Sequence, residues 1–189
     1  MSLYYRRKLD VHLVCGCRSN LTSASYLGIE IIKHQATLLG IPMTEVALPA
    51  VNRCFDFLRV KEFVVAHGTK RLIHGFLSES RQPEPFREFS DYCEAKEIHV
   101  DGPLMGKIPV DNFKTFLKLG FKAIVVGSRV GPEILGTEVT EDSTPKLLET
   151  GLVATFVTDG PLFSRPIKIS KTSVDDRGKF QLLRIESFS

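Results

Sequence analysis

The stretch Val11–Cys17, with the sequence VHLVCGC, decides the fold because it is an apolar run of strand length. Strands that are covered on both faces in a parallel sheet have this composition, whereas strands with one solvated face alternate apolar and polar residues. Phe121–Gly127, with the sequence FKAIVVG, has the same character. The two runs predict buried strands with helices packed on both faces of their sheet.

Working outward from these runs, helical and strand-like segments alternate up to about residue 130. Helices are predicted at Ala24–Leu39, Phe55–His67, Phe86–Glu97 and Pro109–Leu119, and further strands at Met43–Leu48, Arg71–Phe76 and Ile98–Val100. Gly40, Gly68 and Gly120 follow three of the helices, where glycine commonly ends a helix. The alternation predicts an α/β fold with a Rossmann-like, doubly wound parallel sheet.

The pattern changes after residue 130. Short helical segments are predicted at Glu133–Leu135 and Pro145–Leu148, followed by strands at Val153–Thr158, Arg165–Ser170 and Phe180–Glu186. The segment Asp159-Gly160-Pro161 has the residues of a turn, and Asp176-Arg177-Gly178 those of a hairpin turn. We therefore predict a Rossmann-like, nucleotide-binding-type domain over residues 1–130 and a small β-rich extension over residues 131–189.

Composition excludes several classes of function. The 189 residues are 43% hydrophobic and 25% charged, with a net charge of +3 spread along the chain. This is usual for a soluble globular protein and gives no nucleic-acid footprint. No segment approaches the roughly 20 apolar residues of a membrane span. The four cysteines and five histidines form no zinc spacing, so no metal site is predicted, and reduced cysteines suit a cytoplasmic protein.

Two loops that follow predicted strands are candidate ligand sites. Cys15 lies near the end of the first strand, and Arg18 and Ser19 come directly after that strand, where doubly wound folds bind nucleotides. A plain turn between strand and helix is the alternative for this loop. The histidines, His74 among them, are interpreted as structural residues.

The second loop runs from Gly127 through Ser128 and Arg129 to Pro132. Glycines, a hydroxyl group, a guanidinium group and nearby N–H groups have the chemistry of an anion-binding turn. The loop matches no nucleotide-binding fingerprint, so the prediction is limited to a phosphate or carboxylate group.

Three segments resemble a known family. Thr155–Ile169, TFVTDGPLFSRPIKI, is similar to the C-terminal signature of the diphthine–ammonia ligase-type ATP pyrophosphatases, which are adenine nucleotide alpha hydrolase-like proteins. Gly28–Val46 resembles the second helix and following strand of that family, and Leu119–Gly127 resembles a later strand entry. The three segments occur in the family's order and spacing, and the resemblance covers about residues 9 to 185.

The resemblance implies a chemistry. Members of this family use ATP with Mg²⁺ to activate a carboxylate as an acyl-adenylate, and ammonia then displaces AMP. In the diphthine ligase the carboxylate belongs to a modified histidine of translation elongation factor 2. A loop with the pattern S-G-G-K-D-S, between the first strand and first helix, holds the phosphates through its backbone N–H groups.

This chain departs from the family pattern in three places. It contains no S-G-G-K-D-S run, and Tyr4–Lys8 resembles the end of the family's first helix. The family's G-D pair is replaced by Gly75-Phe76. Where the family has G-E-N-G-E-F-H-T, this chain has Leu148–Thr155. Glu149, Gly151 and Thr155 are retained there and are candidate site residues, whereas Leu152 and Ala154 replace an acid and a histidine.

The sequence leaves three hypotheses open. The first is a catalytically impaired ATP pyrophosphatase-like protein that keeps the fold and binds a nucleotide or small anion. The second is an active adenylating amide ligase whose phosphate loop is encoded upstream of Met1. The third is a non-enzymatic interaction module, a homodimer that completes its sheet across two chains. No residue is assigned as catalytic, and Glu149 is the one acidic candidate.

Overall fold

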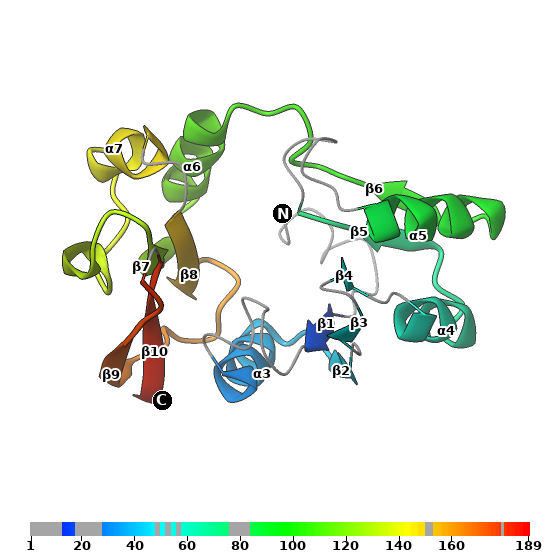
Figure 1. Cartoon of the computed structure of the whole chain (residues 1–189), viewed down its shortest axis with the longest axis horizontal. Coiled ribbons are helices and arrows are strands. Elements are labelled where there is room, and N and C mark those ends of the chain that lie inside the picture. The colour runs from blue at the N-terminus through cyan, green and yellow to red at the C-terminus, as the bar shows by residue number, and fades with distance from the viewer. Residues whose placement is uncertain are drawn as a thin grey trace.

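The fold is mixed α/β, with small parallel strand pairs, their helices and a four-stranded antiparallel sheet (Figure 1). The computed structural model describes residues 13–17, 28–47, 50–51, 54–55, 58–75, 84–149, 153–178 and 180–189.

The stretch that opened the sequence analysis forms a strand in a parallel pair, as predicted. β1 (Leu13–Cys17) pairs with β2 (Met43–Ala47), with Leu13 opposite Met43 and Cys17 opposite Ala47. The helix between them, α3 (Ile29–Leu39), ends at Gly40, whose φ of 60° is a left-handed conformation that glycine adopts without strain. β1, α3 and β2 therefore form one βαβ unit.

A second βαβ unit follows. β5 (Arg71–Ile73) and β6 (His99–Asp101) are parallel, and α5 (Glu84–Ala95) connects them. The preceding helix, α4 (Leu58–Ala66), packs with α5 around a separate core. That core comprises Val60, Val64, Phe86, Phe89, Cys93 and Ile98.

The predicted helix start at Phe55 is wrong. β3 (Ala50–Val51) and β4 (Cys54–Phe55) form a short antiparallel pair, and α4 begins only at Leu58. The spacing of apolar residues indicates that a helix is present, but it does not fix the residue at which the helix begins. Here Cys54 and Phe55 pair in a short strand before the helix starts.

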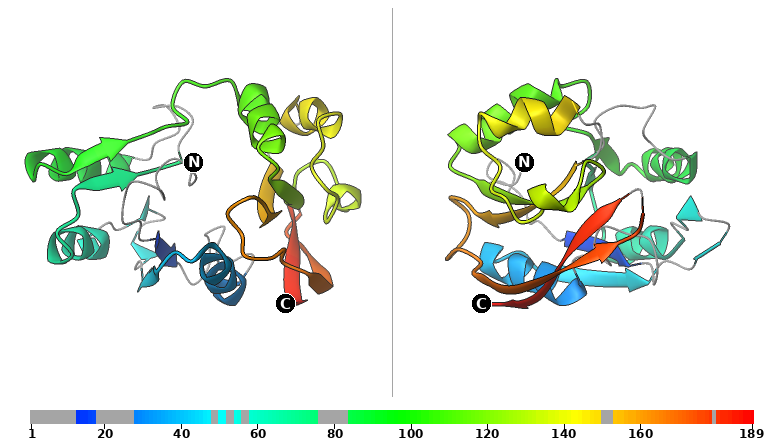
Figure 2. Two further views of the ribbon diagram at one scale, coloured as in Figure 1. Left: turned by 180° about the vertical axis from the view of Figure 1, so that it is seen from behind. Right: turned by 60° about the vertical axis from the view of Figure 1, so that its left-hand side comes forward.

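The two parallel pairs are separate in the part of the chain that the structure describes. No hydrogen-bonded ladder joins β1–β2 to β5–β6 there, so the described residues show two separate parallel pairs and not the single doubly wound sheet expected from the sequence. In both views β5 lies between β6 and β1, and β1 lies between β5 and β2 (Figures 1 and 2).

The C-terminal sheet has the strand order β8-β7-β10-β9, and all its neighbours are antiparallel. Its strands are β7 (Lys122–Ser128), β8 (Val153–Asp159), β9 (Ile169–Asp176) and β10 (Gln181–Phe188). β7 is the second apolar run of the sequence analysis. Both strands that pair with β7 come after residue 130, so a domain boundary at that residue would separate β7 from its partners.

Helices cover both faces of this sheet (Figure 2). α6 (Pro109–Lys118) and α7 (Ser143–Glu149) lie on one face, and the short 3-10 helix η2 (Pro132–Ile134) adjoins them. Their core is formed by Ala123, Val125 and Val139 with partly buried neighbours such as Phe116. α3 covers the other face, so this helix belongs both to the first βαβ unit and to the core of the C-terminal sheet.

The predicted strand Arg165–Ser170 is displaced toward the C-terminus, because β9 begins at Ile169. Pro166 has no N–H group to donate to a ladder. The flanking N–H groups are used elsewhere, since Ser164 donates to the Leu38 carbonyl (2.9 Å) and Ile167 to the Thr158 carbonyl (2.8 Å). The segment therefore wraps around the end of α3 before it enters the sheet.

The helices that the structure describes are all too short or too polar to cross a bilayer.

Candidate functional site

The predicted site residues fall in two different sheets. Cys15 lies in β1, opposite Glu45 of β2. Gly127 and Ser128 end β7, Arg129 follows them, Thr155 lies in β8 and Glu149 is the last residue of α7. Arg18, Ser19 and Gly151 lie outside the described residues. The structure therefore brings together only the candidates on β7 and β8.

Even these candidates point to different faces. Gly127 lies opposite Ala154, whereas Thr155 lies opposite Val125. Ala154 packs against the core under α3, and Val125 belongs to the core under α6 and α7. Because successive side chains of a strand alternate between faces, Thr155 and Gly127 do not share one binding surface.

The backbone at Gly127 is covered by its neighbours. A Cβ atom placed there would lie 2.7 Å from Cζ of Phe180 and 3.0 Å from Cβ of Ala154. The β7–β8 register shifts between Val125 and Gly127, which marks a bulge at this point. Glycine is needed here so that an aromatic ring can lie directly on the strand, and this packing leaves no room for a ligand at Gly127.

The N–H groups of the loop after β7 are already occupied. The side chain of Ser128 is fully buried, and its Oγ accepts hydrogen bonds from the N–H groups of Val130 (3.0 Å) and Gly131 (3.2 Å). A Cβ atom on Gly131 would collide with the Glu133 carboxylate, so a negative charge lies against this loop. The predicted anion site therefore retains only the exposed Arg129 as a potential contact, and the geometry gives it no support.

A different cluster lies at the carboxyl ends of β5 and β6. His74 directly follows β5, its N–H donates to the carbonyl of Asp101 (3.0 Å), and Gly102 follows Asp101. Atoms Cε1 and Nε2 of His74 would lie 2.6 and 2.8 Å from a Cβ atom on Gly102, so the imidazole approaches that glycine closely. We call His74, Asp101 and Gly102 the strand-end cluster. Parallel α/β folds bind ligands at this end of their strands.

Neighbouring side chains fix the imidazole of His74. The ring of Phe86, which is buried on α5, meets it edge-on with centroids 5.0 Å apart. Arg71 Nη1 lies 3.7 Å from Oδ2 of Asp101, so the carboxylate beside the imidazole is partly neutralised. Burial lowers the pKa of His74, and the negative charge of Asp101 opposes that shift. At neutral pH the imidazole is therefore uncharged and can accept or donate one hydrogen bond.

His74 was predicted to be a structural residue, and its packing against Phe86 and Gly102 is compatible with that role. A histidine directly after an apolar run, with Asp-Gly-Pro after the next strand, is the sequence signal for this cluster.

Replacing His74 with glutamine is expected to flatten the pH dependence of stability. The pKa of His74 is lower in the folded protein than in the unfolded chain, where it is about 6.5. Just below pH 6.5 the unfolded chain therefore binds more protons than the folded protein. Wild-type stability is therefore fully present above that pH and is lost as the pH falls toward the lower folded-state pKa. Urea denaturation between pH 8 and pH 5 measures this effect, and curves that run parallel for both proteins would refute it.

The segments Asp101–Leu104 and Asp159–Leu162 have the same sequence, Asp-Gly-Pro-Leu, and form the same turn. The N–H of Met105 donates to the Gly102 carbonyl (2.8 Å), and the N–H of Phe163 donates to the Gly160 carbonyl (2.9 Å). Asp159 accepts a hydrogen bond from the N–H of Gly160 (2.8 Å) and lies 3.9 Å from Lys122. The turn predicted at Asp159-Gly160-Pro161 is therefore confirmed, and the contacts of Asp159 are those of a structural residue.

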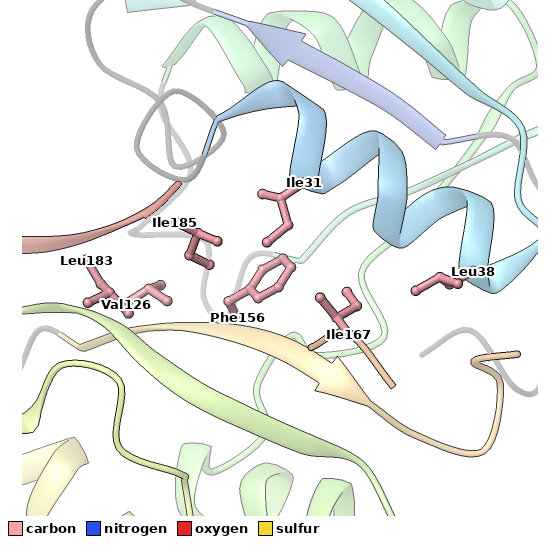
Figure 3. Close-up of a cluster of buried hydrophobic side chains, with 7 residues drawn as sticks. All are labelled: Ile31, Leu38, Val126, Phe156, Ile167, Leu183 and Ile185. Atoms are coloured by element: carbon pink, nitrogen blue, oxygen red, sulfur yellow. The ribbon is translucent and has the colours of Figure 1, made fainter. Parts of the chain in front are cut away.

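The segment that carries the resemblance forms much of the core (Figure 3). Phe156 and Ile167 are buried against Ile31 and Leu38 of α3. Nε2 of Gln35, also on α3, donates to the Val157 carbonyl (2.7 Å). The apolar residues of this segment thus dock α3 onto the C-terminal sheet.

No group of three or more His, Cys, Asp or Glu side chains gathers within the described ranges in a way that could hold a metal ion. Comparison with protein-family models and with curated proteins gives no match.

Proposed function

We propose that this protein is a degenerate ATP pyrophosphatase-like protein, related to diphthine–ammonia ligase, that does not form an acyl-adenylate. The environment of Ala154 carries the proposal. Relatives have a histidine in this register, and here a methyl group packs against the apolar core. A group that cannot exchange protons stands where the family has a proton carrier.

The packing around Ala154 supports the proposal that no histidine is accommodated at this position. Its Cβ lies close to the backbone of Gly127, and the ring of Phe180 covers the same glycine. An imidazole at position 154 would compete with that ring for space, and a charged form would need hydrogen-bond partners in an apolar cluster. The loss of the histidine is therefore matched by the residues around it.

Two βαβ units support a Rossmann-like arrangement for the N-terminal part. Each has a helix between its two parallel strands, α3 in the first unit and α5 in the second. Under this proposal, a nucleotide or small anionic ligand binds at the carboxyl ends of these strands. The described candidates there are Cys15 of β1 and the neutral imidazole of His74, which follows β5; Arg18 and Ser19 lie outside the described residues.

ATP with Mg²⁺ fits the described residues poorly. The N–H groups of Val130 and Gly131 bond to Ser128, and Asp101 is engaged by Arg71. A bound triphosphate would need free N–H donors and oxygen ligands for its metal. We therefore derive no catalytic step through ATP, and we limit the proposed chemistry to ligand binding by the groups at the strand ends.

The alternative, an active amide ligase, is distinguished from a degenerate protein by one measurement, the release of pyrophosphate. An adenylating enzyme releases pyrophosphate from ATP when carboxylate and ammonia are supplied. We expect no protein-dependent release here, because the sequence has no S-G-G-K-D-S run whose N–H groups could stabilise the departing pyrophosphate.

A further inference from the structure

The two edge strands of the C-terminal sheet, β8 and β9, differ in whether other parts of the chain cover them. At the β8 edge, the Val157 carbonyl accepts from Gln35 Nε2 (2.7 Å) and the Thr158 carbonyl accepts from the N–H of Ile167 (2.8 Å). Because these carbonyl groups already accept hydrogen bonds, β8 cannot use them to pair with another strand. β9 forms the other edge, and within the described residues no strand pairs with its outer side.

β9 is long enough to serve as an interface. It spans Ile169–Asp176 and lies at the outer margin of the molecule in both figures (Figures 1 and 2). Val174, near its C-terminal end, is 52% exposed although it lies opposite the buried Leu183. An open edge of this kind presents unpaired N–H and C=O groups, and proteins either protect it or use it.

One face of β9 carries a positive side chain and a negative side chain with a serine midway between them. Lys171, Ser173 and Asp175 share one face, because Lys171 and Ser173 contact Glu186 of β10 (2.8 and 2.7 Å) and Asp175 contacts Arg184 (3.6 Å). The side chain of Lys171 is 72% exposed, so its ammonium group can meet a second carboxylate.

We propose that β9 pairs antiparallel with β9 of a second copy of this chain, about a two-fold axis at Ser173. In this register Lys171 lies opposite the partner subunit's Asp175, and the same pair recurs on the other side of the axis. Cross-strand pairs of opposite charge stabilise a sheet, and a two-fold interface doubles each contact. The two C-terminal sheets then form one continuous sheet.

The neighbouring two-fold registers are poorer. An axis at Lys171 places two lysines opposite each other, and an axis at Val174 places Lys171 opposite the partner's Arg177. An axis at Thr172 brings no opposite charges together within the strand. The charge pattern therefore selects both the occupant, a second copy, and the register.

This interface differs from the homodimer considered from the sequence, in which a donated strand completes the parallel sheet. That arrangement would use the edges of β1 and β5 and would be indifferent to charges on β9. The two dimers can therefore be distinguished by substitutions on β9 alone.

The experiment measures molar mass by light scattering across a range of protein concentrations. We expect a concentration-dependent dimer for the unmodified chain. Lys171→Glu and Asp175→Lys each place like charges opposite each other twice, so each variant alone is expected to bind itself on the order of 10-fold more weakly or worse. Mixed together, the two variants again place opposite charges in register, and a heterodimer is expected.

Lys118→Glu makes the same charge change on the exposed surface of α6 and is the matched control, with circular dichroism confirming that each variant is folded. A monomer at all concentrations would overturn the proposal. So would a dimer that Lys171→Glu leaves unchanged, because the interface would then lie elsewhere, or a mixture of the two variants that stays monomeric.

Discussion

Replacing Phe156 with alanine is expected to lower the free energy of unfolding by about 3–5 kcal/mol. Phe156 is 3% exposed and belongs to the buried cluster that also contains Ile31 of α3 and Val126 of β7 (Figure 3). Truncation removes the ring and leaves a cavity. The surrounding elements cannot readily move in to fill this cavity, because hydrogen bonds also hold them to α3. Urea denaturation followed by circular dichroism measures the loss.

The control for this substitution is Val65→Ala on α4, away from the proposed β9 interface. Val65 is half-exposed, and its truncation is expected to change stability by about 0.5 kcal/mol or less. A loss for Phe156→Ala no larger than that for the control would mean that α3 is not docked on the sheet as described.

A methyl group at Gly160 is expected to cost about 1–3 kcal/mol of stability. A Cβ atom there would collide with the ring of Phe121. That ring is itself buried and stacks on Phe116 with centroids 5.0 Å apart, so it has no open space to move into. The substitution Gly160→Ala tests the close approach directly, and thermal denaturation reports it as a lowered midpoint.

Gly75→Ala is the matched control, because a Cβ atom at Gly75 meets nothing within 4 Å. The two substitutions change the same group in an exposed turn and a packed one. Equal midpoints would show that the Asp-Gly-Pro-Leu turn after β8 does not depend on contact between backbone and ring.

Local pattern was sufficient for the elements whose signals are local. The strand at Leu13–Cys17, the helix ending at Gly40 and the helix beginning at Pro109 follow from apolar runs, a glycine stop and a proline start. The pairing of Lys122–Ser128 does not follow, because a strand buried on both faces has the same composition in a parallel sheet and under helices on an antiparallel one. Its partners lie at least 25 residues away, so no local signal identifies them.

The site was harder to predict for the same reason. The residues around Ser128 indicated free N–H groups, but the side chain of Ser128 itself binds those N–H groups, which is a common property of serine in turns. His74 gained its surroundings from Phe86 and Gly102, which come from other elements. The replacement at Ala154 was visible in sequence, and the structure adds the ring of Phe180 beside it.

We propose that this chain is related to the ATP pyrophosphatases but does not catalyse their reaction. Release of pyrophosphate from ATP with Mg²⁺, ammonia and a carboxylate substrate is the measurement that tests it most directly. The account predicts release no faster than without protein, for the unmodified chain and for Glu149→Gln alike. Protein-dependent release that Glu149→Gln abolishes would contradict it and would assign an active ligase.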